Sequence, residues 1–244
     1  MPARLYAVHG SHPCEAVKRA LDLKGVRYKL VEIPPPFHVP LQQLRFGKRT
    51  VPGIKFENGE KLSGSTAILR RLDTLAPEPK MFPGDARVDE AEAWGESVLQ
   101  PMARRLQWRA FKFAPRTMHG FQEGGRLPPL PMPVVRAMAP GIIAAEFRMN
   151  AVADGIVRED LRELPRLFDR ADALIAEGVL GGETPNAADL QICSSLRLML
   201  TLGDVRAIAG DRPSVALSYR LFPDQSGDVP AGTFPADWLR STKP

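Results

Sequence analysis

The sequence predicts an α+β domain built on a mixed four-stranded sheet, followed by an all-α domain. Short apolar or alternating runs separated by turn residues fill the first 73 residues, whereas apolar residues at helical spacing dominate from Val88 onward. Charge divides in the same way, because residues 1–80 carry a net +7 and residues 81–244 a net −2. We therefore expect domains at 1–80 and 87–225, with a tail at 226–244.

The first domain begins with a strand, a helix and a second strand. Leu5-Tyr6-Ala7-Val8 is a short apolar run typical of a buried strand. Pro13 then opens a helical pattern that Gly25 ends. The segment from Tyr28 to Ile33 alternates as a second strand before three consecutive prolines.

A hairpin and a further helix complete this domain. Leu41 to Phe46 is a candidate short helix, and Val51 to Phe56 is the third strand. Asn58-Gly59 is a strong hairpin turn signal ahead of the returning strand. Ser65 to Leu72 has the pattern of a helix. A β-α-β unit followed by a hairpin and a packing helix is the thioredoxin arrangement in outline.

The second domain opens with a linker and a long helix. Residues 74–86 contain three prolines, and a helix follows from Val88 in which we expect Pro101 to cause a bend. Residues 115–133 are rich in Pro and Gly and predict a long irregular connection. A second helical stretch at 134–156 is predicted to be interrupted near Pro140.

Two further helices follow in this domain. Apolar residues from Leu161 to Ile175 form an amphipathic helix that Gly178 ends. Asn186 and Asp189 have the spacing of an N-cap and its capping-box acid. The next residues are almost all apolar, which predicts a centrally buried helix. The segment after Pro223 shows little periodicity.

Composition excludes several classes of protein. The 244 residues are 44% apolar and 25% charged, as in ordinary globular chains. No apolar run approaches the length of a membrane span, and the N-terminus lacks the apolar core of a signal peptide. Cys14 and Cys193 cannot form a disulfide scaffold, and no zinc-site spacing occurs. We expect a cytoplasmic protein without a metal, and scattered basic residues disfavour nucleic acid.

Four short motifs occur in a particular order. They are Ser11-His12-Pro13-Cys14, Thr50-Val51-Pro52, Leu62-Ser63-Gly64-Ser65-Thr66-Ala67-Ile68 and Thr184-Pro185-Asn186-Ala187-Ala188-Asp189. With this order and spacing, the chain resembles the cytosolic glutathione transferase family over most of its length. The first motif is similar to the serine-type, theta-like pattern. The resemblance implies a thioredoxin-like domain that binds glutathione and a helical domain behind it.

Ser11 is the candidate catalytic residue. The resemblance implies that its hydroxyl donates a hydrogen bond to the sulfur of glutathione, at a helix N-terminus whose dipole also favours a thiolate. Ser11 could instead only cap the helix, although Pro13 at the first helical position would place that cap at His12. Cys14 is a possible redox thiol, or a small buried residue of the first turn, and Cys193 belongs to an apolar helical run.

The remaining predicted contacts to glutathione come from two loops. The resemblance implies a cis proline at Pro52, with Thr50 and Val51 beside the cysteinyl part of glutathione; a trans proline opening an edge strand is the alternative. Ser65 and Thr66 at a helix N-terminus suit the γ-glutamyl carboxylate, or act only as caps. Gly64 departs from the acidic or amide residue usual in the family, and nearby Lys48 and Arg49 could help to hold an anion.

The second substrate is expected between the domains, over the first long helix. Candidates by position are Trp94, Met102, Arg104, Trp108 and Phe111, each of which could equally belong to the core. The loop at 115–133 could cover this cleft.

Three functions fit the pattern. The first is conjugation, isomerisation or dehalogenation of a small electrophile by glutathione or a related low-molecular-weight thiol. The second is a thiol–disulfide oxidoreductase that uses Cys14, and the third is a non-catalytic binding protein on the same fold. The resemblance also implies a homodimer with no nucleic acid or membrane partner.

Overall fold

The computed structural model describes residues 2–35 and 37–239, and it has the predicted fold class. A four-stranded sheet runs in the order β2-β1-β3-β4, with β1 and β2 parallel and the other neighbouring pairs antiparallel. Its strands and helices are β1 (Ala3–Ala7), α1 (His12–Leu23), β2 (Tyr28–Glu32), α2 (His38–Phe46), β3 (Gly53–Lys55), β4 (Lys61–Ser63) and α3 (Ser65–Leu75).

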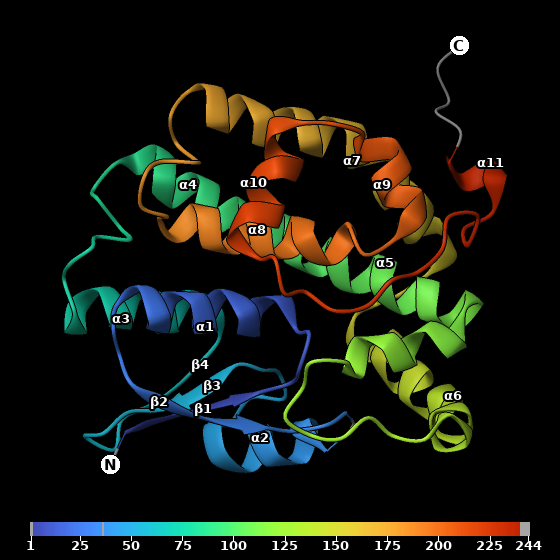
Figure 1. The fold of residues 1–244 in the computed structure, drawn as a ribbon, viewed down its shortest axis with the longest axis horizontal. Coiled ribbons are helices and arrows are strands. Elements are labelled where there is room, and N and C mark those ends of the chain that lie inside the picture. The colour runs from blue at the N-terminus through green and yellow to red at the C-terminus, as the bar shows by residue number, and fades with distance from the viewer. Residues whose placement is uncertain (1, 36, 240–244) are drawn as a thin grey trace.

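Helices cover both faces of the sheet. Figure 1 shows α1 and α3 between the sheet and the helical half of the molecule, with α2 on the opposite face. Leu5 of β1 and Ile54 of β3 are fully buried, and α1 buries Val17 and Leu21. The sheet therefore forms one side of a continuous hydrophobic core, which extends through α1 and α3 into the helical half.

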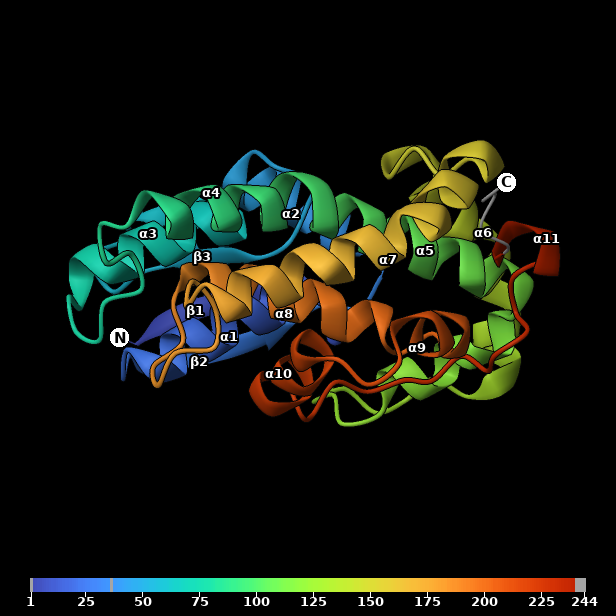
Figure 2. The same ribbon diagram turned by 90° about the horizontal axis from the view of Figure 1, so that it is seen from above.

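The helical half follows without a further strand among the described residues. Its elements are α4 (Ala86–Trp94), the π-helix η1 (Gly95–Leu99), α5 (Gln100–Phe113), the 3-10 helix η2 (Pro115–Gln122), α6 (Met132–Met149), α7 (Asp154–Ala176), α8 (Ala187–Met199), α9 (Gly203–Ala209), α10 (Pro213–Leu221) and α11 (Ala236–Leu239). Figure 2 shows α6 at one end of the molecule. The described part of the chain contains no helix with the length and apolar character that a membrane span needs.

Helix α8 is the central helix, as its composition predicted. All of its residues are buried. The predicted capping box is confirmed, since the backbone N–H of Asp189 donates to Asn186 Oδ1 at 3.0 Å and that of Asn186 donates to Asp189 Oδ2 at 2.9 Å. Asp189 also accepts from the backbone N–H of Gly181 at 2.8 Å, so its buried carboxylate is fully engaged.

The helical half differs from the prediction in three places. The long helix was expected to bend at Pro101. Instead, the π-helix at Gly95–Leu99 interrupts it just before that proline. Gly95 packs closely on α8, since a Cβ there would lie 3.1 Å from Ile192 Cγ1. Helix α6 continues through Pro140, because its solvent-exposed side tolerates the missing hydrogen bond. The connection at 115–133 is partly helical.

The segment expected to be a tail packs against the helices. Val229 pairs with Leu202, and Asp204 accepts from the backbone N–H groups of Gly232 and Phe234 at 2.6 and 2.9 Å. Trp238 is buried. These contacts are polar and long-range, which explains why periodicity did not reveal them. Residues 240–244 of the predicted tail lie outside the described residues.

A buried lysine fixes the segment between α3 and α4. The side chain of Lys24 is fully buried and donates to Asp73 Oδ1 at 2.6 Å, to the carbonyl of Ala76 at 2.7 Å and to that of Pro79 at 2.6 Å. Asp73 also accepts from the backbone N–H of Met81 at 2.8 Å. All three ammonium protons are thus used. The expected division of the chain into domains at this segment remains a prediction.

Replacing this lysine tests its contribution to stability. Lys24→Met should lower the free energy of unfolding by about 3 kcal/mol, because it leaves Asp73 and two carbonyls without their cation. Lys18→Met is the matched control on the same helix, where a partly exposed pair with Glu15 should contribute less than about 1 kcal/mol. Urea denaturation of both variants measures the difference. Equal losses would contradict the assigned role of Lys24.

Candidate functional site

The strand register brings three of the predicted motifs to one edge of the sheet. Tyr6 of β1 pairs with Gly53, and Gly53 pairs with Ser63 of β4. The loop that leads to Ser11, the Val51–Pro52 bond and the start of α3 therefore lie together. The carbonyl of Pro52 accepts from the backbone N–H of Gly64 at 3.0 Å, which ties two of these segments directly. The predicted cis geometry of Val51–Pro52 is confirmed.

Ser11 is the N-cap of α1, but its side chain makes no capping hydrogen bond. The helix begins at His12, one residue earlier than the expected start at Pro13. Backbone donors are scarce here, because the N–H groups of Ser11, Cys14 and Glu15 are bonded to local carbonyls and Pro13 has none. Any stabilisation of a thiolate at this helix end consequently depends on the Ser11 hydroxyl more than on free backbone N–H groups.

Cys14 faces the interior of the protein. It is fully buried, and burial raises the pKa of its thiol to about 12, although the nearby Ser11 hydroxyl and the backbone of Val8 oppose this shift. Cys193 of α8 is also buried, and burial raises the pKa of its thiol further. Both cysteines are therefore protonated at neutral pH and inaccessible, which is the behaviour of small apolar core residues.

The side chains of Ser65 and Thr66 belong to a buried polar network between the two halves. Gln100 Nε2 donates to Ser65 Oγ at 3.1 Å and to Gln191 Oε1 at 2.8 Å. Thr66 Oγ1 donates to Glu92 Oε1 at 2.6 Å and accepts from Gln191 Nε2 at 2.9 Å. This network joins α3 to α4, α5 and α8. Thr66 Oγ1 already donates its proton in the hydrogen bond to Glu92, so the backbone N–H groups at the start of α3 are the main donors left to bind an anion.

The surroundings of these groups are open and basic. Gly64 has a φ of 96°, a conformation that disfavours a side chain, although a Cβ there would meet no atom within 4 Å. Lys48, Arg49 and Thr50 are exposed on the loop before the cis proline. Val51 is half-buried against the core.

The connection at 115–133 covers the loop before Ser11. His9 Nε2 lies 2.7 Å from the carbonyl of Glu123, and the carboxylate of Glu32 accepts from the backbone N–H of Arg126 at 3.0 Å. Gln225 Nε2 donates to the carbonyl of Gly10 at 3.2 Å from the C-terminal segment. Two segments of the helical half therefore close over the β1–α1 loop, whereas the expected cover over the second-substrate cleft stays a prediction.

Four of the five residues expected to contact the second substrate pack within or against the core. Trp94 is buried and stacks under Arg170, with the guanidinium carbon 4.4 Å from the ring centroid. Trp108 packs edge-on against Phe111, which is itself buried. Met102 is also part of the core. These side chains thus serve packing, as apolar residues at helical spacing most often do.

Arg104 has a different environment. It is partly buried, and burial lowers the pKa of its guanidinium. The positive charge of Arg104 also acts on His12. The side chain of His12 is buried, and neither of its ring nitrogens has a hydrogen-bond partner. Burial, together with Arg104, holds the pKa of His12 well below its usual value. Sequence reasoning missed His12, Gln100 and Gln191, because only the contact between the halves shows that these polar residues are buried.

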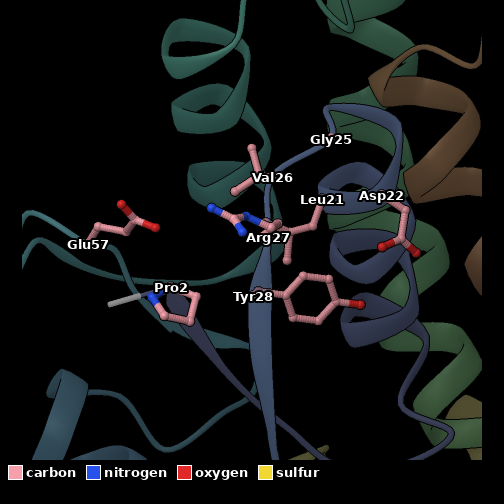
Figure 3. A pocket seen from close by; sticks show the side chains of 8 residues that line it. All are labelled: Pro2, Leu21, Asp22, Gly25, Val26, Arg27, Tyr28 and Glu57. Atoms are coloured by element: carbon pink, nitrogen blue, oxygen red, sulfur yellow. The ribbon is translucent and has the colours of Figure 1, made fainter.

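Surface hollows occur elsewhere in the molecule. One of about 860 Å³ lies at the opposite edge of the sheet, where Figure 3 shows Tyr28 projecting from the start of β2 toward α1. Its lining residues are Pro2, Leu21, Asp22, Gly25, Val26, Arg27, Tyr28 and Glu57. None of these residues belongs to the four motifs, so this hollow is separate from the candidate site. A smaller hollow of about 240 Å³ lies between α7 and α10.

Comparisons with known proteins agree with this fold. Residues 5–80 match the family model for the glutathione S-transferase N-terminal domain. The structure of glutathione S-transferase I from maize, in complex with an atrazine glutathione conjugate, superposes with a TM-score of 0.60 at 20% identity, covering 92% of this chain and 93% of that chain. No curated protein sequence matches the chain.

Two further structures have the same architecture. Glutathione transferase F7 from Populus trichocarpa superposes with a TM-score of 0.58 at 14% identity over 98% of this chain and 99% of that one. Glutathione S-transferase I bound to lactoylglutathione gives 0.57 at 17% identity over 92% and 95%. The chain therefore has the glutathione transferase fold, a thioredoxin-like domain followed by a helical region.

Thiol reactivity provides the first test of this site. With a pKa of about 12, Cys14 should not react with Ellman's reagent in the native protein at pH 8, and neither should Cys193. Both should react after unfolding in guanidinium chloride, which serves as the control. Rapid release of one equivalent of thionitrobenzoate by the native protein would show that one of the thiols is exposed.

The buried imidazole predicts a pH dependence of stability. Since the pKa of His12 is lower in the folded than in the unfolded state, only the unfolded chain gains this proton as the pH falls below about 6.5. His12 should then cost up to about 1.4 kcal/mol per pH unit. Urea denaturation at pH 7, 6 and 5 should show a smaller loss for His12→Gln than for the wild type. His119→Gln, at a partly exposed position, should retain the wild-type slope; equal slopes for all three would refute the assignment.

Proposed function

We propose that this protein is a serine-type glutathione transferase, which binds glutathione at the edge of the sheet formed by Ser11, Val51–Pro52 and the start of α3. The observation that carries the proposal is the convergence of these three segments in a domain that matches the transferase N-terminal model over residues 5–80. The exposed Lys48 and Arg49 favour a ligand with two carboxylates such as glutathione.

Each part of glutathione has a candidate partner. The γ-glutamyl carboxylate would accept hydrogen bonds from the backbone N–H groups of Ser65 and Thr66 at the start of α3, where the helix dipole favours an anion. The backbone of Val51, with Thr50 beside it, would pair with the cysteinyl part. This places the sulfur toward the N-cap of α1.

The reaction follows from the position of Ser11. Its hydroxyl makes no capping hydrogen bond and lies beside the Cys14 thiol, so it could exchange that contact for a hydrogen bond donated to the glutathione sulfur and stabilise the thiolate. The thiolate then forms a carbon–sulfur bond with a small electrophile, and the leaving group departs with its bonding electron pair. By analogy with the family, we expect a cytoplasmic homodimer that acts in detoxification.

One observation favours a second function, that of a non-catalytic binding protein. The hydroxyls of Ser65 and Thr66 are held in the buried network, and Gly64 offers no side chain to the glutamyl amine. Both features reduce the number of contacts to glutathione. The buried, protonated Cys14 gives no comparable support to a thiol–disulfide oxidoreductase.

Calorimetry and conjugation kinetics with Ser11→Ala test the proposal. Wild-type protein should bind glutathione and conjugate it to 1-chloro-2,4-dinitrobenzene. Ser11→Ala should retain binding but lose about 10- to 100-fold in kcat, because one hydrogen bond to a charged sulfur is removed. Ser97→Ala is the matched control, since that hydroxyl bonds only to the carbonyl of Ala93 on an exposed turn.

The possible outcomes separate the two functions. Binding without conjugation by the wild type would favour the non-catalytic protein. No heat with glutathione would reject glutathione as the ligand. An unchanged kcat in Ser11→Ala would reject the proposed role of Ser11 but not the proposed transferase activity.

A further inference from the structure

Arg104 has an uncompensated charge between the two halves of the molecule. It stands in the second turn of α5 and is partly buried. The hydrogen bond recorded for its guanidinium joins Nη1 to Gln100 Oε1 at 3.5 Å, which is long. Within residues 2–35 and 37–239, no carboxylate oxygen lies within the 4.0 Å of an ion pair. The inference that follows rests on the proposed function.

Two neighbouring arginines of α5 each form an ion pair with a carboxylate. Arg105 makes a two-pronged contact with Asp160, from Nε at 2.7 Å and from Nη2 at 2.8 Å. Arg109 pairs with Asp154 at 3.0 Å. Helix α7 thus provides carboxylates for two arginines of α5 and none for Arg104. The guanidinium of Arg104 is partly buried and has no carboxylate partner among the described residues, so its donors are available to an anion from outside the chain.

The charged and titratable groups near Arg104 do not neutralise it. Glu146 of α6 is the nearest acid to influence it, but its carboxylate binds Asn150 Nδ2 at 2.9 Å and burial raises its pKa. Glu96 is exposed on η1, and Arg105 adds a like charge. His12 is buried and neutral. Acidic groups therefore act on Arg104 from a distance, but none of those in the described residues forms an ion pair with it.

This positive group lies beside the proposed thiol site. Gln100, one turn before Arg104, donates to Ser65 Oγ at the start of α3. The charge of Arg104 helps to lower the pKa of His12, and His12 directly follows Ser11 in the sequence. A substrate that approaches the sulfur near Ser11 from the helical half would consequently come within reach of the Arg104 guanidinium.

We propose that the electrophilic second substrate carries a carboxylate and that Arg104 binds it. The planar guanidinium can form two parallel hydrogen bonds with a carboxylate, so it would both attract the substrate and orient its electrophilic carbon. This makes Arg104 the residue that selects anionic over neutral electrophiles.

A pair of matched substrates tests the proposal. 4-Chloro-3,5-dinitrobenzoate and 4-chloro-3,5-dinitrobenzamide have the same reacting carbon and differ in charge. With either compound, the glutathione thiolate forms a bond to the carbon that bears chlorine, and chloride leaves with the bonding pair. The variants are Arg104→Met and, as a control for charge on the same helix, Lys112→Met at an exposed position. Rates are corrected for the uncatalysed reaction.

The wild type should show a kcat/KM about 10- to 100-fold higher for the benzoate than for the benzamide. Arg104→Met should abolish this preference with little effect on the benzamide, while Lys112→Met preserves it. Equal losses for both substrates would overturn the proposal, because Arg104 would then act on the common thiolate. Equal kcat/KM values in the wild type would overturn it as well.

Calorimetry separates this outcome from failure of the proposed function. Glutathione should bind equally to the wild type and to Arg104→Met, whereas 4-nitrobenzoate should bind only to the wild type. If glutathione fails to bind the wild type, the proposed function is rejected, and binding of 4-nitrobenzoate alone still tests Arg104. If 4-nitrobenzoate binds both proteins equally, the anion site at Arg104 is rejected.

Discussion

The buried polar network between α3, α4, α5 and α8 is the constraint on which the rest of the structure depends. Two glutamines, Gln100 and Gln191, bridge the hydroxyls of Ser65 and Thr66 to the carboxylate of Glu92. Polar groups at this depth are costly unless their hydrogen bonds are made, so the network accepts one arrangement of the two halves and penalises others. The start of α3 and the first turn of α5 are thereby fixed relative to each other.

The same network explains the chemistry left at the candidate site. It uses the side chains that a helix N-terminus would otherwise present to an anion, and it leaves the backbone N–H groups. At the start of α1 the situation is reversed, because Pro13 and local hydrogen bonds remove most backbone donors, and the Ser11 hydroxyl, which lies beside the Cys14 thiol, makes no capping hydrogen bond. One helix end thus provides backbone donors and the other a hydroxyl, which is a suitable combination for a carboxylate and a sulfur.

Burial keeps some titratable groups near the site neutral, whereas Arg104 stays charged. Cys14 and His12 are neutral, because each would have to be charged in a place that water does not reach. Arg104 cannot respond in the same way, since a guanidinium remains protonated even when burial lowers its pKa. It therefore retains a charge that the surrounding α5 and α6 residues do not pair, and this charge faces the region next to Ser11.

The sequence by itself determined the fold class and the capping box of α8. These features depend on local signals, namely hydrophobic periodicity, turn residues and capping spacing. The proline-rich connection and the C-terminal segment were predicted less well, because long-range polar contacts from Glu32, Gln225 and Asp204 hold them. Only the tertiary structure decided which polar side chains are satisfied. Ser65 belongs to the network between the two halves, Ser11 does not, and Arg104 lacks the carboxylate that Arg105 has, because these differences arise where segments far apart in sequence meet.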